Sequence, residues 1–507
     1  MGKPNVILIL ADDLGIGDLS CFNPDSKIST DSIDALASQG LRCTDAHASS
    51  ALCTPSRYGL LTGRYSLRSR LKKMVLQGYE GHLIEDGRAT LGSLLKEQGY
   101  NTACVGKWHL GLDWETKQLP ETFGMDVDVI TKDVRLESLV LDYDKPVGNG
   151  PNDYGFDYCY VTPGSLDIAP YVFIENDSLT ARPAALSGTT EFWPTKNTGT
   201  GKEIPYISQW PLGHIAPDYD HREVVPDSAC RVLRLIDEYA ADDKPFFIYY
   251  PIHAPHVPCI PTPEFEGKSP LGPYGDLVLM IDDIVGRIMK KLDEKGLSDN
   301  TVFLLTSDNG GEHEFPEFGH SSNHIYRGFK SDIWDGGHRI PYIVRYPGFI
   351  PPGSICSQTV CLTDIMATLA DLLGFDLADN EGEDSVSNLE LWRGADKVVR
   401  EATIHHSGNG MFGIRKGKWK LEMCPDGGGF VRPGAVPQEN DLPIQLYDME
   451  NDPCEAINLC EEYPDVVSEL TRELSEFIVS GRSTPGIPQK NTGPEWWPEL
   501  NWIPEPN

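Results

Sequence analysis

Several features that mark large classes of protein are missing from this chain. No stretch of its 507 residues approaches the roughly 20 consecutive apolar residues that a membrane-spanning helix requires. The 12 cysteines include no C-x-x-C pair, which argues against a zinc ribbon or a thioredoxin-type site. There is no internal repeat and no low-complexity block. The chain therefore reads as a globular protein, and its length suggests two or more domains.

Positive charge is also scarce. Lys and Arg total 43 against 76 Asp and Glu, which gives a formal net charge of −33. Nucleic acids bind to basic faces, so this balance argues against a nucleic-acid partner. An anionic substrate would have to be captured by a local positive pocket.

Two further observations concern the compartment. The first residues contain no charged segment followed by an apolar leader, because the run Val6–Leu10 is too short for one. On this ground the protein either stays in the cytoplasm or is a trimmed mature form. Cys454 and Cys460 are the first candidates for a disulfide, with reduced and buried thiols as an equal alternative.

Buried strand patterns alternate with amphipathic helix patterns along most of the chain. Strands are predicted at residues 5–10, 101–105, 245–250 and 301–306. Helices are predicted at residues 30–37, 90–98, 227–240, 276–295 and 363–373. This order predicts an α/β fold with a large mixed, mostly parallel central sheet flanked by helices.

The composition and the predicted secondary structure change in two places along the chain. Residues 148–226 are rich in Pro, Gly and aromatic residues, and we interpret them as an irregular substrate-pocket insertion within a domain of residues 1–400. Residues 401–507 predict a smaller α+β domain with an antiparallel sheet and a Pro- and Trp-rich tail.

Polar residues follow each of the predicted apolar strands. They are Asp12 and Asp13, Lys107 with His109, His253 with His256, and Asp308 with Asn309. In open α/β sheets ligands bind outside the carboxyl ends of the strands. We therefore expect the four strand ends to converge on one face.

The residue types at these ends suggest a metal site and acid–base groups. Asp12, Asp13, Asp308 and Asn309 offer only oxygen ligands, which suit calcium or magnesium better than zinc, although each could instead be a helix cap or turn residue. Lys107, Arg57 and Lys330 could neutralise a tetrahedral oxyanion, with solvated surface charges as the alternative. His109 and His256 could act as acid and base, with a structural role as the alternative.

Cys53 lies in the run Cys53-Thr54-Pro55-Ser56-Arg57, which predicts a loop leading into a helix. At a helix N-terminus a cysteine beside an arginine is either a reactive centre near an anion or a buried structural residue. A thiolate is a soft ligand and a poor partner for a hard cation. Oxygen at position 53 would fit the predicted site better.

The Cys53–Arg57 run resembles the C-x-P-x-R signature of the formylglycine-dependent (type I) sulfatases, a family within the alkaline phosphatase superfamily. The resemblance continues through Leu61–Arg64, through Gly106-Lys107-Trp108-His109-Leu110-Gly111 and through Gly336-Gly337-His338-Arg339. It covers most of the chain up to about residue 400. The remainder is similar to arylsulfatase-A-like and galactosamine-6-sulfatase-like members.

The resemblance implies an O-sulfate ester hydrolase in which Cys53 is converted to formylglycine by a formylglycine-generating or sulfatase-maturing enzyme. The hydrated aldehyde would supply the missing oxygen. One calcium ion would be held by Asp12, Asp13, Asp308, Asn309 and residue 53. Arg57 would steady the hydrated aldehyde, Lys107 and Lys330 would bind sulfate oxygens, His256 would protonate the leaving alcohol, and His109 would take a proton to expel sulfate.

Substrate and compartment also follow from the resemblance. The expected substrate is a sulfated carbohydrate, contacted by Ser165, His405 and His406, and a periplasmic or secreted location is expected although no leader is visible. The alternatives are a phosphate or phosphonate ester hydrolase of the same superfamily and a non-catalytic, calcium-stabilised carbohydrate-binding protein.

Overall fold

The computed structural model describes residues 2–117, 140–189, 192–196, 203–207, 210–430 and 441–505. The chain forms two compact units. The first unit comprises Met1–Asp12, Leu76–Leu83 and Thr90–Val302, and the second comprises Asp13–Val75, Ile84–Ala89 and Phe303–Asn507. Among the described residues, no helix is both long enough and apolar enough to cross a membrane.

The first unit is built on a mainly parallel set of strands in the order β1-β12-β4-β5-β6-β7. Their bounds are β1 (Asn5–Asp12), β12 (Phe246–Pro255), β4 (Asn101–Lys107), β5 (Tyr158–Thr162), β6 (Ile174–Glu175) and β7 (Ser178–Leu179). The first four strands pair in parallel and the last two are antiparallel. Every residue of β1 and β12 is buried, as expected for apolar strands covered on both faces.

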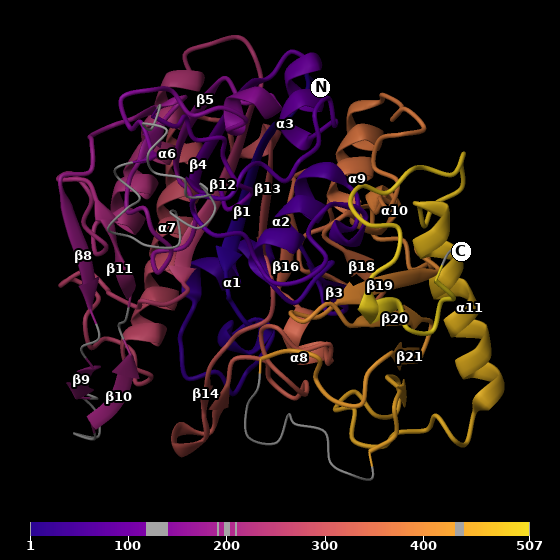
Figure 1. The fold of residues 1–507 in the computed structure, drawn as a ribbon. Coiled ribbons are helices and arrows are strands. Elements are labelled where there is room, and N and C mark those ends of the chain that lie inside the picture. The colour runs from indigo at the N-terminus through magenta and orange to yellow at the C-terminus, as the bar shows by residue number, and fades with distance from the viewer. Residues whose placement is uncertain are drawn as a thin grey trace, which may run out of the picture. The chain divides into compact units, whose positions relative to one another are not determined.

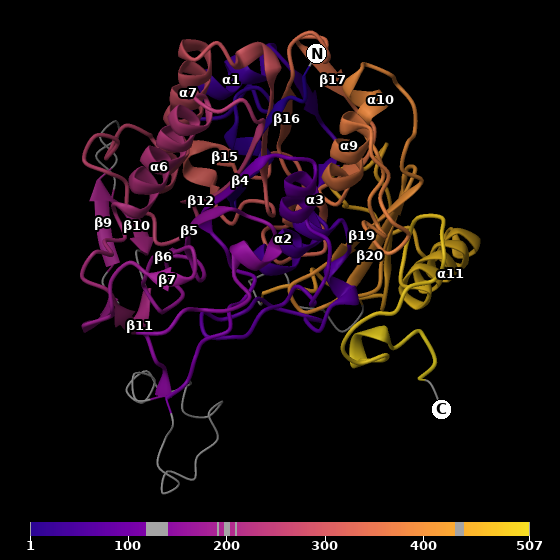
Figure 2. The same cartoon turned by 90° about the horizontal axis from the view of Figure 1, so that it is seen from above.

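Helices α3 (Leu91–Glu97), α6 (Val224–Tyr239) and α7 (Pro273–Glu294) flank these strands. Both α6 and α7 pack on β12 and lie side by side (Figures 1 and 2). The Thr90 side chain caps α3 by accepting a hydrogen bond from the Ser93 N–H at 3.1 Å. The helices predicted at 90–98, 227–240 and 276–295 are thus confirmed, with shifted ends.

In the second unit, four strands follow the order β17-β2-β16-β13. They are β17 (Ser354–Cys356), β2 (Leu41–Cys43), β16 (Tyr342–Arg345) and β13 (Thr301–Ser307). Outside this set lie the short strands β3 (Ala46–His47), β18 (Val360–Cys361), β14 (Glu314–Phe315) and β15 (His320–Ser321). The helices are α1 (Asp31–Ser38), α2 (Cys53–Thr62), α8 (Asp335–His338), α9 (Asp364–Leu373) and α10 (Leu389–Trp392).

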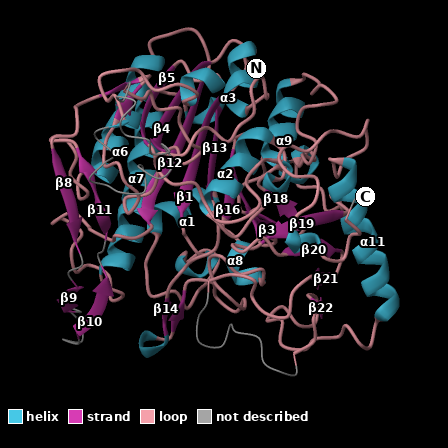
Figure 3. Cartoon of the chain, in the orientation of Figure 1, coloured by secondary structure: helices cyan, strands magenta, loops and turns pink. Residues whose placement is uncertain are grey.

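The C-terminal part of the second unit contains a four-stranded antiparallel sheet, visible in Figure 3 beside its long helix. It consists of β19 (Ala402–His406), β20 (Phe412–Lys416), β21 (Trp419–Glu422), β22 (Gln445–Asp448) and the helix α11 (Pro464–Ser480). Phe412 and Leu421 on the sheet pack with Leu470 and Leu474 on α11 in one buried cluster. The predicted fold class, a mixed and mostly parallel sheet with helices plus a small antiparallel sheet, is confirmed.

Residues 148–226 are more regular than expected. They include β5, β6 and β7, the paired strands β8 (Ala185–Thr189) and β11 (Trp210–Ile215), and the pair β9 (Phe192–Lys196) and β10 (Glu203–Ile207). Residues 190–191, 197–202 and 208–209 of this stretch lie outside the described part of the chain. The frequent Gly and Pro in this stretch argued against strands in the sequence. These strands form nonetheless, because strand formation depends strongly on tertiary pairing.

The strand predicted at 245–250 is also longer than expected. β12 continues to Pro255 and so includes His253. Pro251 interrupts the apolar run, yet the pairing with β1 continues to Asp12 opposite Pro255 after a register shift. Cys454 and Cys460, the candidate disulfide pair, are free thiols in the structure.

Candidate active site

In the first unit, the predicted residues Asp12 and Lys107 meet. Asp12 ends β1 and Lys107 ends β4, the two strands on either side of β12. The Lys107 Nζ lies 2.8 and 2.7 Å from the two carboxylate oxygens of Asp12, and both side chains are fully buried. His256 directly follows β12. Three of the four predicted strand ends therefore come together at one edge, as expected from parallel strands.

In both His109 and His256, one ring nitrogen is occupied by a hydrogen bond to the backbone, so the other nitrogen is the one that can accept or donate a proton. His109 adopts a left-handed backbone conformation with φ of 55°, an uncommon state for a non-glycine residue. Its Nε2–H donates to the Leu76 carbonyl at 2.8 Å, so Nδ1 is the basic nitrogen of the neutral ring. The Nδ1–H of His256 donates to the Val257 carbonyl at 2.6 Å, which assigns the remaining proton chemistry to Nε2.

Ser165 and His253 complete the first-unit candidates. Ser165 lies in the loop after β5 with 2% of its surface exposed, and its Oγ forms no hydrogen bond within the described residues. His253 Nε2 lies 2.7 Å from the Thr162 Oγ1, a contact that ties β12 to the end of β5. This contact gives His253 a structural role.

In the second unit, helix α2 begins at Cys53, as the sequence predicted. Leu52 is the N-cap residue, Pro55 occupies the first turn, and the helix ends at Gly63 in the left-handed conformation. Cys53 is 2% exposed, and Arg57, one turn later, is fully buried. The Arg57 Nε and Nη2 lie 3.0 and 2.6 Å from the Asp308 Oδ2. A charge-assisted fork of this kind fixes the guanidinium firmly.

Asp13, Asp308 and Asn309 form a buried group that we call the oxygen cluster. The Asn309 Nδ2 donates to the Asp13 Oδ1 at 2.8 Å, and the Asp13 N–H donates to the Asp308 Oδ1 at 3.2 Å. Lys330 contributes its Nζ at 2.8 Å from the Asp13 Oδ2. Asp13 holds a left-handed backbone with φ of 66°, a conformation that often marks functional sites.

The oxygen cluster fits a hard cation. All its ligand atoms are carboxylate or amide oxygens, the donors that calcium prefers. The Asn309 Oδ1 is fully buried and accepts no hydrogen bond within the described residues, although Asn309 Nδ2 is satisfied by Asp13 and Gly310. Gly310 also allows close backbone approach, because a Cβ there would lie 1.9 Å from the Gly336 oxygen. A cation would satisfy the buried Asn309 oxygen.

His405 and His406 lie on β19 in different surroundings. The His405 ring is fully buried and stacks on His338 with centroids 3.8 Å apart, while His406 packs against Phe412 at 5.1 Å. Burial lowers the pKa of both, to about 4 for His406. His405 thus belongs to a histidine group that the sequence analysis missed, because its other members, His47 and His338, stand alone in the sequence.

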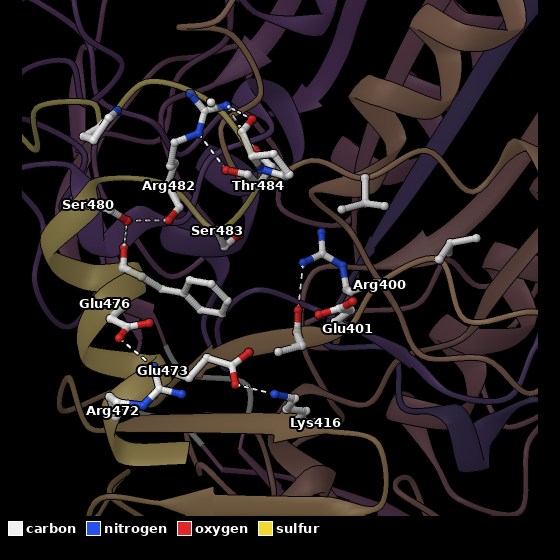
Figure 4. Close-up of a pocket in the computed structure, with 17 residues that line it drawn as sticks. Arg400, Glu401, Lys416, Arg472, Glu473, Glu476, Ser480, Arg482, Ser483 and Thr484 are labelled. Carbon is white, nitrogen blue, oxygen red and sulfur yellow. Dashed lines mark hydrogen bonds and ion pairs between the residues drawn. The ribbon is translucent and has the colours of Figure 1, made fainter. Parts of the chain in front are cut away.

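A groove of about 780 Å³ lies elsewhere in the second unit, between β19, β20 and α11 (Figure 4). Four of its charged side chains pair with each other, the Lys416 Nζ lying 2.6 Å from Glu473 and the Arg472 Nη1 2.6 Å from Glu476. No predicted site residue lines it. Size alone therefore does not identify the active site.

Comparisons with known proteins identify the family of this chain. The Sulfatase family model matches residues 4–375. An N-acetylgalactosamine-6-O-sulfatase from Bacteroides thetaiotaomicron is 34% identical over 517 aligned positions, covering 94% of this chain and 93% of that protein. Arylsulfatase A from Bos taurus is 31% identical, covering 94% and 87%.

A solved structure points the same way. It comes from work on the metabolism of multiple glycosaminoglycans by Bacteroides thetaiotaomicron, and it matches with a TM-score of 0.79 at 33% identity, covering 94% of this chain and 99% of that chain. The resemblance found in the sequence is therefore confirmed. The chain belongs to the sulfatase family, whose members are sulfuric ester hydrolases.

Proposed function

We propose that this sulfatase hydrolyses an O-sulfate ester on a carbohydrate, with 6-sulfated N-acetylgalactosamine as the first substrate to test. The reaction class follows from the family. The sugar is suggested by the N-acetylgalactosamine-6-O-sulfatase that is 34% identical over 94% of this chain. The observation that carries the site is the bonding of Arg57, one turn after Cys53, to Asp308 of the oxygen cluster.

Cys53 is the residue we assign to formylglycine, made by a maturing enzyme. Once formed, formylglycine supplies a hydrated aldehyde whose hydroxyl oxygen is the nucleophile toward sulfur. Asp12, Asp13, Asp308 and Asn309 would hold calcium, which supplies a Lewis acid that polarises this oxygen.

Three cations serve the anionic substrate. Arg57 keeps its guanidinium on Asp308 and orients residue 53 from the same helix. Lys107 and Lys330 hold their ammonium groups on Asp12 and Asp13 and offer their remaining N–H donors to sulfate oxygens. Fixed donors of this kind stabilise the negative charge that develops on those oxygens.

The two histidines divide the proton transfers. His256 is held by its Nδ1–H on the Val257 carbonyl and, as an imidazolium that also carries a proton on Nε2, gives that second proton to the leaving alcohol oxygen and becomes neutral. His109 is held by its Nε2–H on the Leu76 carbonyl and takes a proton at Nδ1 from the remaining hydroxyl of residue 53. Ser165 and His406 stay candidates for contacts with the sugar. The surroundings of His405 support another role, argued below.

The test uses protein co-expressed with a formylglycine-generating enzyme. Sulfate release is measured from N-acetylgalactosamine sulfated at O6 or at O4, alongside the corresponding phosphate esters. We expect sulfate from the 6-sulfated sugar, and loss of that activity in Cys53→Ser but not in Cys230→Ser, whose thiol is exposed in the first unit. Dominant phosphate release would establish the rival phosphate or phosphonate hydrolase. No release, with an aldehyde at residue 53 by peptide mass, would contradict the proposed sugar.

A further inference from the structure

Three histidines from separate segments of the second unit meet in its interior. His47 ends β3, His338 ends α8 and His405 lies in β19, and all three are fully buried. We call this group the histidine cluster. One ring nitrogen from each lies within 4.8 Å of those of the others.

The hydrogen bonds of His47 and His338 fix where their protons are. The His47 Nε2 lies 2.9 Å from the Asp45 Oδ1, and the Arg339 Nη2 lies 2.7 Å from the same oxygen, as expected for an ionised carboxylate. A carboxylate only accepts, so His47 carries its proton on Nε2. The His338 Nε2 lies 2.9 Å from the Ile333 carbonyl, which also only accepts. His338 therefore carries its proton on Nε2 as well.

Two ring nitrogens that carry no proton therefore face each other. The His47 Nδ1 and the His338 Nδ1 are 3.0 Å apart. In the neutral rings both are acceptors, so the contact is repulsive unless a proton or a metal ion lies between them.

The third ring is in the same situation. The His405 ring is fully buried, and its polar contact is with the Ala48 backbone, which can serve only one of its two nitrogens. It stacks on His338 at 3.8 Å and lies 4.8 Å from His47, measured between ring centroids. Leaving the other buried nitrogen unsatisfied is costly, and coordination of an ion is one way to satisfy it.

We propose that His47, His338 and His405 bind one transition-metal ion, with zinc as the expected occupant. Neutral imidazole nitrogens suit zinc, whereas the oxygen cluster suits calcium. Zinc–nitrogen distances of about 2.0–2.1 Å place tetrahedral ligand nitrogens about 3.3 Å apart, close to the observed separation of the two Nδ1 atoms. Metal-bound histidines usually donate their other N–H to a carboxylate or a carbonyl, as His47 and His338 do here.

The site would have a structural role. It would join the segment preceding Cys53, the segment following Lys330 and the first strand of the C-terminal sheet. The residue that orients His47 is itself held in place. The Asp45 carboxylate also accepts hydrogen bonds from the Arg339 Nη2 at 2.7 Å and from the Thr359 Oγ1 at 2.6 Å. Asp45 is thus held in place to orient His47. The ion would fix the position of His338 beside Arg339 in the signature segment.

The test measures metal content in the full-length protein. Cells are grown with added zinc, and the purified protein is dialysed against chelator and assayed by elemental analysis. We expect about one zinc per chain, separable from calcium by element. His405→Gln should lose the zinc, while His406→Gln, the matched change at the adjacent buried residue on the same strand, should retain it.

Cobalt replacement keeps the proposal falsifiable if His405→Gln does not fold. The wild-type protein refolded with Co²⁺ should show visible absorption typical of tetrahedral nitrogen ligation. Absence of zinc from the wild type and absence of that absorption after refolding with cobalt would overturn the proposal. A proton shared between His47 and His338, detected by nitrogen NMR of the metal-free protein at neutral pH, would overturn it as well.

Discussion

The oxygen cluster and the histidine cluster are two buried polar groups of the same unit, and they balance their charges in different ways. In the oxygen cluster each carboxylate meets a cation, Lys330 on Asp13 and Arg57 on Asp308. In the histidine cluster the two closest nitrogens, on His47 and His338, are both acceptors at 3.0 Å. Carboxylates can thus be balanced by neighbouring side chains, whereas neutral imidazoles facing each other require an added proton or metal ion.

The largest effect that separates the two clusters is expected from Asp13→Asn. The change keeps the shape but removes one negative charge from the oxygen cluster, so calcium binding weakens and Lys330 loses its ionic partner. Sulfate release should fall on the order of 10³-fold, the size associated with loss of a fixed electrostatic group. The measurement is kcat/KM, with zinc content determined on the same sample. Loss of zinc together with activity would contradict the claim that the two clusters bind their ions independently.

Two chelators sharpen the same contrast. A calcium-selective chelator should abolish sulfate release, and added calcium should restore it. Refolding with a zinc-selective chelator should instead lower the free energy of unfolding, by about 3 kcal/mol relative to protein refolded with free zinc at 100 times the dissociation constant. Thermal unfolding reads out the second effect. Equal unfolding midpoints with and without zinc would contradict a structural ion at the histidine cluster.

Lys420 tests the support beneath the histidine cluster. Its fully buried Nζ lies 2.9 Å from Asp335 and 2.5 Å from Glu455. Lys420→Met removes the cation from buried Glu455 and leaves Asp335 with Arg339 alone, and we expect a loss of about 3–5 kcal/mol in the free energy of unfolding. Lys418→Met is the matched control, since Lys418 is 41% exposed and pairs with Asp448 at the surface, where the expected loss is at most about 1 kcal/mol. Denaturant unfolding of both variants distinguishes these values, and equal losses would contradict the account.

The smallest effect concerns pH. Burial lowers the pKa of His406 from 6.5 to about 4. Between these values the unfolded state binds the proton and the folded state does not, so this residue makes the protein less stable as pH falls from 6.5 to about 4. His406→Phe should reduce the acid-induced loss of stability by about 1–3 kcal/mol. Unfolding curves of wild type and variant at pH 7 and pH 4.5 give the difference, and parallel losses in the two proteins would refute the assignment.

The sequence supported the fold class and the location of the strand ends because both depend on local patterns. The apolar run of β1 and the polar pair Asp12–Asp13 that ends it can be read directly, and so can the start of α2 at Cys53. Parallel strands then bring Asp12 and Lys107 together without further information. The family resemblance added the roles of these residues, which physical pattern alone left open.

The parts that could not be predicted depend on contacts between distant segments. His47 and His338 are separated by 291 positions, and neither stands in a pattern that indicates a metal site. His405 was assigned to the substrate pocket because of its position in the family, and its stacking on His338 became visible only in the folded chain. β5 was missed for a related reason, since its pairing with β4 outweighs the turn-forming residues around it.

The most direct test of the central claim is the ratio of sulfate to phosphate released from matched sugar esters by protein whose residue 53 has been analysed by peptide mass. The account predicts that sulfate release dominates, that it scales with the fraction of residue 53 converted to the aldehyde, and that Cys53→Ser removes it. Sulfate release that persists in Cys53→Ser, or phosphate release that exceeds it in fully converted protein, would contradict the account.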